Sequence, residues 1–368
     1  MKLAWIAAVA VALSVGPAAA RHHHHTGGDR PSSARKITVD SVNNAAWSGD
    51  TGAVPPALIV KAEVLLARRH FSPGEIDGKN GDNFRKALQA FQQTNGLNVT
   101  GNIDSPTWSA LAANESQPAL VSYTISAEDV AGPFEKSIPH QLDRMAKLQG
   151  LSYKDPSEEL AEKFHMSEGL LRALNRDARL DRVGEKIFVA GVQPMSLRSG
   201  HGHSVEVIAP GKHDSEGAKV TTIVVDKAAS DVRAYDRDGN LVAFYPATIG
   251  SEEKPAPSGT FQVRRVAWNP DYHYDPKFAW KGVKAKHKLT IKPGPNNPVG
   301  LVWIDLTAPS YGIHGTPDPK NIGKTESHGC IRLTNWDAVD LAQMVRRGTV
   351  VKFEDNRTGT RPAATVAK

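Results

Sequence analysis

The sequence predicts a multidomain protein: an all-α three-helix module near the N-terminus, a small α/β module, and a mainly-β C-terminal domain that carries one helix. Three observations predict this order. Apolar residues recur at helical spacing between residues 55 and 113, two short strands flank two short helices between 122 and 191, and β-branched stretches alternate with turns between 219 and 354. A chain of 368 residues can hold roughly two or three domains.

The composition is that of a soluble globular protein with a mild basic excess. Hydrophobic residues make up 40% of the chain and charged residues 23%, which is ordinary for such proteins. The formal net charge is +6 and the pI is near 9.2. Because no block of Lys and Arg accompanies this excess, the composition argues against a nucleic-acid partner. It does suit residence near an anionic cell wall.

Residues 1–20 have the physical features of a secretory signal. Lys2 supplies a positive start, residues 3–15 are apolar, and residues 18–20 are small alanines that suit cleavage. The apolar run is shorter than the roughly 20 residues of a membrane span, although a retained anchor stays open as an alternative. We therefore expect a secreted protein of the periplasm or cell wall.

Small and polar residues mark the connections between modules. They dominate residues 21–54 and 194–218, which we predict to be linkers. The run of histidines at 22–25 could bind a metal ion, but a solvated stretch is the simpler interpretation. The polar tail, residues 355–368, is expected to be disordered.

The segment 55–113 predicts three helices. The first carries an apolar face formed by Leu58, Ala62, Leu65 and Leu66. The second is expected to stop at Gly96. Ser105 and Pro106 suit the N-cap and first position of the third helix, which Trp108 would anchor in the core.

The segment 122–191 predicts the order strand, helix, helix, strand. The elements are expected at 123–125, 160–164, 170–175 and 183–189. A long insertion, residues 126–157, separates the first strand from the first helix.

From residue 219 onward the pattern becomes β. Asp238-Gly239, set between two apolar stretches, is a strong hairpin signal. Strands are predicted at 221–225, 232–235, 241–245, 261–268, 299–304 and 349–353. A helix is expected to begin at Thr334 or Asn335 and to run to Arg347, with Gly348 as its stop. Many short strands with one helix predict a sandwich or barrel-like sheet, and the aromatic, basic stretch 268–292 predicts a mobile loop over a site.

The candidate site lies in residues 311–333, which hold Cys330, the only cysteine of the chain. A free thiol has a pKa of about 8.5, so it needs a base at neutral pH, and an imidazole can take its proton to form a thiolate–imidazolium pair. His314 precedes the cysteine and can meet it only if the chain doubles back. Gly329 leaves neighbouring backbone N–H groups free to bind an oxyanion, and Arg332 would share a strand face with the thiol and could hold a carboxylate.

Each of these residues also has a simpler interpretation. A lone cysteine is more often a small buried hydrophobe, and a lone histidine is usually structural or exposed. The combination in one short window favours a catalytic site. Zinc would need three or four ligands with a repeated spacing, so a metal is not expected.

The block H-G-T at 314–316 followed by S-H-G-C-I-R-L-T-N at 327–335 resembles the signature of the L,D-transpeptidase catalytic domain family. The elements A-P-S-G-T-F at 256–261 and P-G-P-N-N-P-V-G at 293–300 resemble further parts of that signature. The resemblance covers residues 219–354. The phrases L-L-A-R-R-H-F-S-P-G-E-I-D-G and G-N-I-D-S-P-T-W-S-A-L in the helical segment are similar to the three-helix peptidoglycan-binding domain. The segment 122–191 is similar to the lysin motif, which binds N-acetylglucosamine chains, apart from its insertion; a structural spacer is an equally good interpretation.

The resemblance implies a transferase that acts on peptidoglycan without a cofactor. Cys330 would be the nucleophile and His314 the base, while His328 would orient groups beside them and Gly329 would border the oxyanion site. Arg332, Ser327 and Tyr311 would bind the substrate.

In the implied reaction, the thiolate attacks the third residue of a tetrapeptide stem, D-alanine leaves, and an amine resolves the thioester. The products are a 3→3 cross-link or an attached wall lipoprotein or outer-membrane protein. An L,D-carboxypeptidase that uses water, and a non-catalytic wall-binding protein, are the alternatives.

Overall fold

The computed structural model describes residues 37–49, 52–199, 205–208, 220–251, 254–278, 285–325 and 329–355. The expected signal segment, the histidine run and nearly all of the C-terminal tail lie outside these residues. From Ile37 onward the chain forms one compact unit. Within the described part, no helix is both long and apolar enough to span a membrane.

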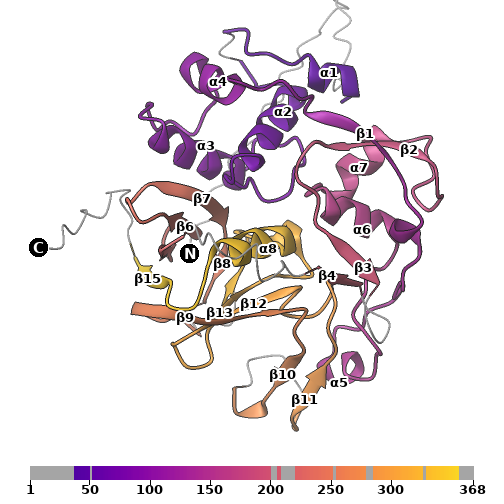
Figure 1. Ribbon diagram of the computed structural model, residues 1–368, viewed down its shortest axis with the longest axis vertical. Helices are drawn as coiled ribbons and strands as arrows, with labels where there is room; N and C mark the ends of the chain where they lie inside the picture. Colours follow the sequence, from indigo (N-terminus) through magenta and orange to yellow (C-terminus); the bar gives the residue numbers. More distant parts are fainter. Residues whose placement is uncertain are drawn as a thin grey trace, which may run out of the picture. The chain divides into compact units, whose positions relative to one another are not determined.

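The N-terminal helical module contains the three predicted helices, α2 (Pro56–Ala67), α3 (Asp82–Thr94) and α4 (Ser105–Ala112) (Figure 1). Pro56 occupies the first position of α2, where a missing N–H costs no hydrogen bond. The N-cap of α4 is Asp104 and not Ser105 as predicted. The Asp104 carboxylate accepts a bond from the Thr107 N–H at 2.9 Å, and Ser105 is the first helical residue.

Part of the predicted first linker is ordered structure. Helix α1 (Val39–Asn43) begins with a capping box in which Thr38 and Ser41 bond each other's backbone. The Asn43 side chain exchanges two bonds with the Leu120 backbone, at 2.8 and 3.0 Å. This segment therefore ties the helical module to the next strand.

The segment after the helical module has the predicted strand–helix–helix–strand order. Strand β1 (Leu120–Thr124) pairs antiparallel with β2 (Lys186–Ala190), and α6 (Pro156–Lys163) and α7 (Glu168–Leu174) lie between them in the chain. The insertion carries the 3₁₀ turn η1 (Glu128–Val130) and the short helix α5 (Leu142–Met145).

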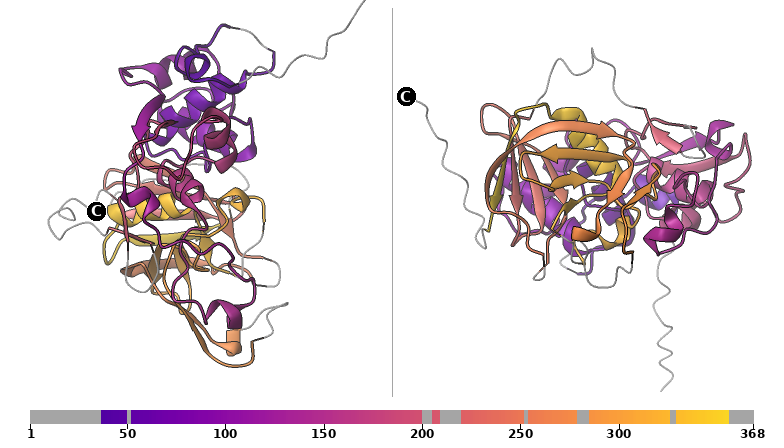
Figure 2. Two further views of the ribbon diagram at one scale, coloured as in Figure 1. Left: turned by 90° about the vertical axis from the view of Figure 1, so that its right-hand side faces the viewer. Right: turned by 90° about the horizontal axis from the view of Figure 1, so that it is seen from below.

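The C-terminal domain is mainly β. Its nine strands are, in sheet order, β7 (Leu241–Pro246), β6 (Asp231–Tyr235), β5 (Thr222–Asp226), β15 (Val350–Glu354), β9 (Gly259–Trp268), β12 (Val302–Leu306), β13 (Gly312–His314), β14 (Ile331–Arg332) and β8 (Thr248–Ile249). The two ends of this order, β7 and β8, are separated by a single residue in the chain. The sheet must therefore curve until its ends approach, which makes it nearly closed (Figure 2).

Helix α8 (Asn335–Met344) packs against β12 and β13 (Figure 1). Thr334 caps it by accepting a bond from the Asp337 N–H at 3.2 Å. The helix ends three residues before the predicted Arg347, because Val345 is already extended. Strand β12 likewise starts after the predicted residue 299, because Gly300 has a φ of +61° and forms a turn.

Two predicted irregular segments contain strands. The second linker holds the hairpin β3 (Leu197–Ser199) and β4 (Val205–Val207), and the predicted mobile loop holds β10 (Tyr272–Tyr274), the 3₁₀ turn η2 (Pro276–Phe278) and β11 (Leu289–Ile291). The Asn269 side chain fixes β4 by two bonds to the Val207 backbone, at 2.8 and 2.9 Å. Helix α5 of the insertion lies against β11 (Figure 1).

Candidate active site

The candidate site is built on two short parallel strands. In the pairing of β13 with β14, His314 lies opposite Arg332, and Ile313 lies opposite Ile331. Cys330 immediately precedes β14, and the Gly312 N–H donates a hydrogen bond to its sulfur. The sheet thus brings together three of the residues singled out from the sequence, with the cysteine half-buried.

His314 is held in one orientation and one tautomer. Its Nδ1 lies 2.7 Å from the Gly315 carbonyl oxygen, and a carbonyl can only accept, so Nδ1 carries the proton. Nε2 is then the unprotonated nitrogen, as a general base requires. The Trp303 indole stacks on the imidazole, with ring centroids 5.4 Å apart and planes at 20°.

Burial shifts the pKa values of the cysteine and the histidine toward their uncharged forms. Burial lowers the pKa of His314 to about 3, and the charge of Arg332 adds to the shift. Burial also raises the pKa of the Cys330 thiol, although the Gly312 N–H and Arg332 oppose that change. Both shifts favour a thiol beside a neutral imidazole over the thiolate–imidazolium pair considered from the sequence.

Arg332 is surrounded by groups that can be negative. Burial lowers the pKa of its guanidinium, while Cys330, Asp318 and Tyr272 favour the charged form. Burial, followed by the nearby Cys330, raises the pKa of Tyr272 to about 12, which keeps this phenol protonated beside the thiol. A protonated phenol and a guanidinium are both hydrogen-bond donors toward a substrate at the sulfur.

The glycines around the site are required by close contacts. An added Cβ on Gly312 would lie 2.5 Å from Cζ2 of Trp303. Gly329 has a φ of +103°, and a Cβ there would lie 2.9 Å from Cε1 of Tyr311. The Tyr311 hydroxyl donates to the Pro255 carbonyl at 3.3 Å, so this ring is fixed beside Gly329.

Two predicted site residues, Ser327 and His328, lie outside the described residues. Conversely, sequence reasoning did not assign Trp303, Tyr272 or Asp318 to the site. Tyr272 belongs to the aromatic stretch predicted to cover a site, so its position was signalled in part. Nothing in the local pattern distinguishes Trp303 from an ordinary strand residue.

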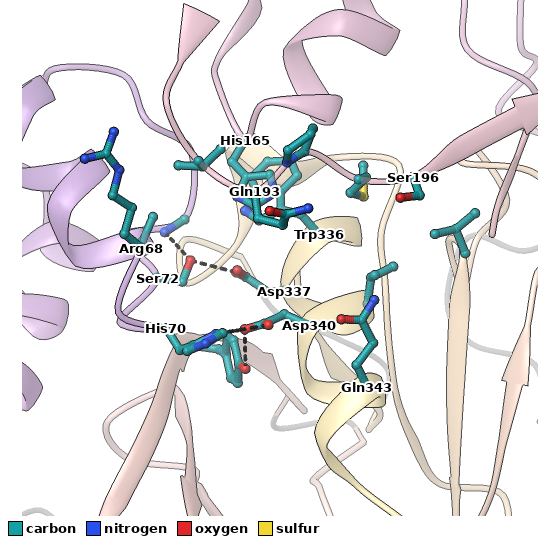
Figure 3. Close-up of a pocket in the computed structure, with 18 of the residues that line it drawn as sticks. Arg68, His70, Ser72, His165, Gln193, Ser196, Trp336, Asp337, Asp340 and Gln343 are labelled. Carbon is teal, nitrogen blue, oxygen red and sulfur yellow. Dashed lines mark hydrogen bonds and ion pairs between the residues drawn. The ribbon is translucent and has the colours of Figure 1, made fainter. Parts of the chain in front are cut away.

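A large cavity lies elsewhere in the molecule. It measures about 750 Å³ and is bordered by the end of α2, by residues 192–196 and by α8 (Figure 3). In it, the Ser72 hydroxyl donates to Asp337 at 2.9 Å and His70 Nδ1 lies 2.9 Å from an Asp340 oxygen. None of the predicted site residues lines this cavity, and its polar contacts join the helical module to α8. No cluster of potential metal ligands occurs among the residues that the structure describes.

Comparison with known proteins identifies two families. The family described as "L,D-transpeptidase catalytic domain" matches residues 220–353, and the one described as "Putative peptidoglycan binding domain" matches residues 57–111. A relative named "Putative L,D-transpeptidase YqjB", from Bacillus subtilis, is 33% identical over 143 residues, which cover 37% of this chain and 73% of the relative. The chain belongs to the L,D-transpeptidase family.

Other members of the L,D-transpeptidase family match over similar spans. "Putative L,D-transpeptidase YkuD" of Bacillus licheniformis is 33% identical over 131 residues. The matched residues cover 36% of this chain and 64% of that relative's length. A solved L,D-transpeptidase from Mycobacterium smegmatis is 21% identical, covers 48% of this chain and 76% of its own, and has a TM-score of 0.31.

Proposed function

We propose that the protein is a peptidoglycan L,D-transpeptidase that works through a cysteine thioester. The observation that carries the proposal is the placement of His314 on β13 and of Cys330 directly before the adjoining parallel strand β14, with the basic nitrogen of the imidazole unprotonated. Family membership and the peptidoglycan-binding match at residues 57–111 support the choice of substrate. The site of action is then the cell wall or periplasm.

In the first half-reaction, the Cys330 S–H proton passes to Nε2 of His314 as the sulfur attacks the carbonyl carbon of the third stem residue. The C–N bond to the terminal D-alanine breaks, and the imidazolium returns its proton to the leaving amine. Because the resting pair is neutral, proton transfer accompanies attack and does not precede it. Backbone N–H groups near Gly329 would stabilise the oxyanion.

In the second half-reaction, an amine of a neighbouring stem attacks the thioester carbonyl. His314 takes the amine proton, the C–S bond breaks, and the thiol is regenerated as the new amide forms. Arg332 would bind a stem carboxylate, with Ser327 and Tyr311 beside it and His328 as an orienting group. Water in place of the amine would give carboxypeptidase activity, and a protein amine would attach a lipoprotein or outer-membrane protein to the wall.

The test uses purified disaccharide-tetrapeptides and mass spectrometry of the products. The proposal predicts release of D-alanine together with a tetrapeptide–tripeptide dimer, and loss of both products in Cys330→Ala. Tripeptide without dimer would assign the carboxypeptidase reaction. Wild-type product levels from Cys330→Ala would remove the cysteine from the mechanism.

A further inference from the structure

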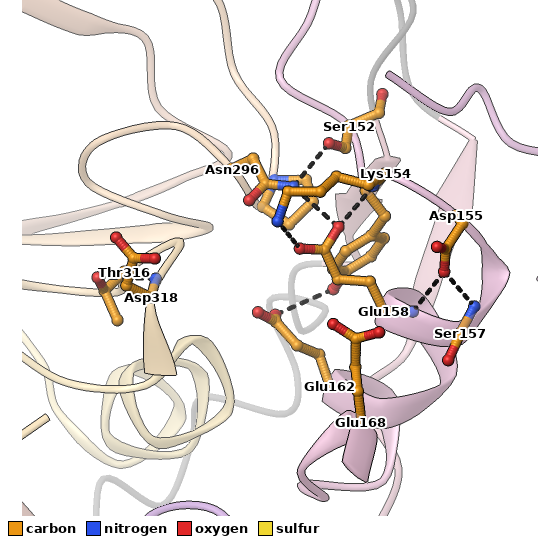
Figure 4. Close-up of polar contacts among 12 residues, drawn as sticks. Ser152, Lys154, Asp155, Ser157, Glu158, Glu162, Glu168, Asn296, Thr316 and Asp318 are labelled. Carbon is orange, nitrogen blue, oxygen red and sulfur yellow. Dashed lines mark hydrogen bonds and ion pairs between the residues drawn. The ribbon is translucent and has the colours of Figure 1, made fainter. Parts of the chain in front are cut away.

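Glu162 is a buried acidic residue on α6, outside the catalytic domain, and it reaches into that domain. Its Oε2 accepts a bond from the Tyr153 hydroxyl at 3.2 Å and another from Nδ2 of Asn335 at 2.9 Å. Only 5% of the residue is exposed. Figure 4 shows Glu162 together with Glu158 of the same helix and Asn296 of the catalytic domain. Its contact therefore joins the α/β module to the first residue of α8.

Asn335 is fully buried, and each part of its amide is used. Its Oδ1 accepts a bond from the Leu301 N–H at 3.2 Å, and its Nδ2 also donates to the Pro295 carbonyl at 3.1 Å. The same Oδ1 is pressed against two glycines. An added Cβ on Gly300 or Gly315 would lie 2.1 or 2.2 Å from it. The amide oxygen therefore packs directly against the Gly315 backbone.

The Gly315 carbonyl accepts the hydrogen bond from Nδ1 of His314. The Gly315 N–H donates to the Val302 carbonyl at 3.3 Å. A shift of Asn335 would therefore move the carbonyl that selects the histidine tautomer. The path runs through contacts only, from Glu162 to Asn335, from Asn335 to Gly315, and from Gly315 to His314.

We propose that Glu162 is a positioning residue for the reaction, acting through Asn335 and Gly315 to hold His314 with Nε2 free. This inference rests on the proposed function of His314 as the base. It also gives the α/β module a role: the face of α6 that carries Glu162 is occupied by the catalytic domain and is not open to a glycan.

The surrounding contacts hold the same interface together. The Leu151 backbone exchanges two bonds with the loop before β12, one with the Pro293 carbonyl and one with the Asn296 N–H, both at 2.9 Å. The Asn296 amide donates to the Ser152 carbonyl at 2.8 Å and to Glu158 at 3.2 Å (Figure 4). These bonds do not involve Glu162 and hold the α/β module against the catalytic domain. A substitution at Glu162 should therefore disturb Asn335 without separating the module from the domain.

The ionisation state of Glu162 fits this role. Burial, the largest influence, raises the pKa of Glu162 to about 8; Glu158 and Glu75 act in the same direction, while the bonds from Asn335 and Tyr153 oppose the shift. At neutral pH the group is an un-ionised acid with one strong acceptor oxygen. Glutamine has the same shape and also offers one such oxygen, so it should substitute well.

The test compares Glu162→Gln, Glu162→Leu and the matched control Glu159→Leu, which removes a second buried acid from the same helix. Because a displacement near 1 Å can cost about 100-fold, Glu162→Leu should lower kcat for D-alanine release about 10- to 100-fold with little change in KM. Glu162→Gln and Glu159→Leu should stay within about threefold of wild type. Nitrogen-15 NMR of His314 should show a protonated Nδ1 in the wild type and a tautomer mixture in Glu162→Leu.

Four results would overturn the proposal or the proposed function. An unchanged kcat and His314 spectrum in folded Glu162→Leu, or an equal loss in Glu159→Leu, would overturn the proposal. If Glu162→Leu does not fold, Tyr153→Phe replaces it, because this variant removes the hydroxyl bond to Glu162. It should lower kcat about two- to fivefold. An unchanged kcat in Tyr153→Phe would also overturn the proposal. If the wild type releases no D-alanine, the proposed function fails, while the NMR comparison still tests positioning.

Discussion

The contact between Gly312 and Trp303 allows the geometry of the base to be perturbed without replacing the nucleophile or the base. Gly312→Ala would place a Cβ 2.5 Å from Cζ2 and 2.6 Å from Cε2 of the indole, whereas ordinary contact begins at 3.4 Å. The indole ring must therefore move by about 0.9 Å, the difference between 3.4 and 2.5 Å. The indole stacks directly on His314, so the imidazole moves with it.

Gly312→Ala should lower both the stability of the protein and the rate of the reaction. Overpacking of this kind destabilises a protein by about 1–3 kcal/mol. A catalytic group displaced by nearly 1 Å can lose about 100-fold in rate. We therefore expect Gly312→Ala to remain folded and to lose about 100-fold in kcat/KM for D-alanine release from a tetrapeptide stem.

The assay pairs initial rates with thermal unfolding. Gly169→Ala in α7 is the control, because its nearest atom within 4 Å is Ser167 Oγ at 4.0 Å and alanine favours a helix by up to about 1 kcal/mol. It should keep wild-type activity. A wild-type kcat/KM in Gly312→Ala would show that the stacked Trp303 indole does not position His314.

Three further predictions follow from the buried groups. His314→Ala should slow acylation of the thiol about 100-fold or more, measured by stopped-flow mixing with a tetrapeptide; an unchanged rate eliminates it as the base. Because the pKa of His314 is lowered to about 3, it stays unprotonated well below the ordinary 6.5, so kcat/KM should not fall between about pH 7 and pH 5; a drop centred near 6.5 would contradict the burial argument. Burial raises the pKa of Asp337 from 3.8 to about 8, so the stability that this acid contributes is full below 3.8 and is lost as the pH rises through 8. In urea unfolding, the free energy of unfolding of Asp337→Asn should rise relative to that of the wild type by up to about 1.4 kcal/mol per pH unit across that window. Parallel pH profiles of the two proteins would exclude a protonated Asp337.

Elements with local signals could be predicted from the sequence. Asp238-Gly239 marks the β6–β7 hairpin, where Gly239 has a φ of +82° and the Asp238 N–H bonds the Asp236 carboxylate at 2.9 Å. Gly96, with a φ of +66°, marks the stop after α3 in the same way. In each case glycine adopts a positive φ that other residue types disfavour, so the residue type itself signals the turn and neighbours in the fold add little.

Features that depend on distant partners could not be predicted. Glu162 and Asn335 are 173 positions apart, and nothing in either local pattern indicates that they meet. Helix α1 and strand β4 lie in segments rich in small polar residues, and side-chain bonds from Asn43 and Asn269 hold them to other parts of the chain. A hydrophobic pattern reports which face of an element is buried, but it does not identify the residue that covers that face.

The catalytic cluster shows both situations. The motif places Cys330 and Arg332 two residues apart. His314 reaches them only because β13 and β14 pair in parallel. The charge state could not be read from the motif. It depends on burial, which lowers the pKa of His314 and raises that of Cys330 and so favours a neutral pair.

In the proposed mechanism the Cys330 sulfur carries the acyl group. This can be observed by intact-protein mass spectrometry after rapid quenching of a reaction with a tetrapeptide donor and no acceptor amine. We expect a mass gain equal to the donor minus D-alanine, located on the peptide that contains Cys330 and absent from Cys330→Ala. D-alanine release by the wild type without any adduct on that peptide, or an adduct on another residue, would contradict it.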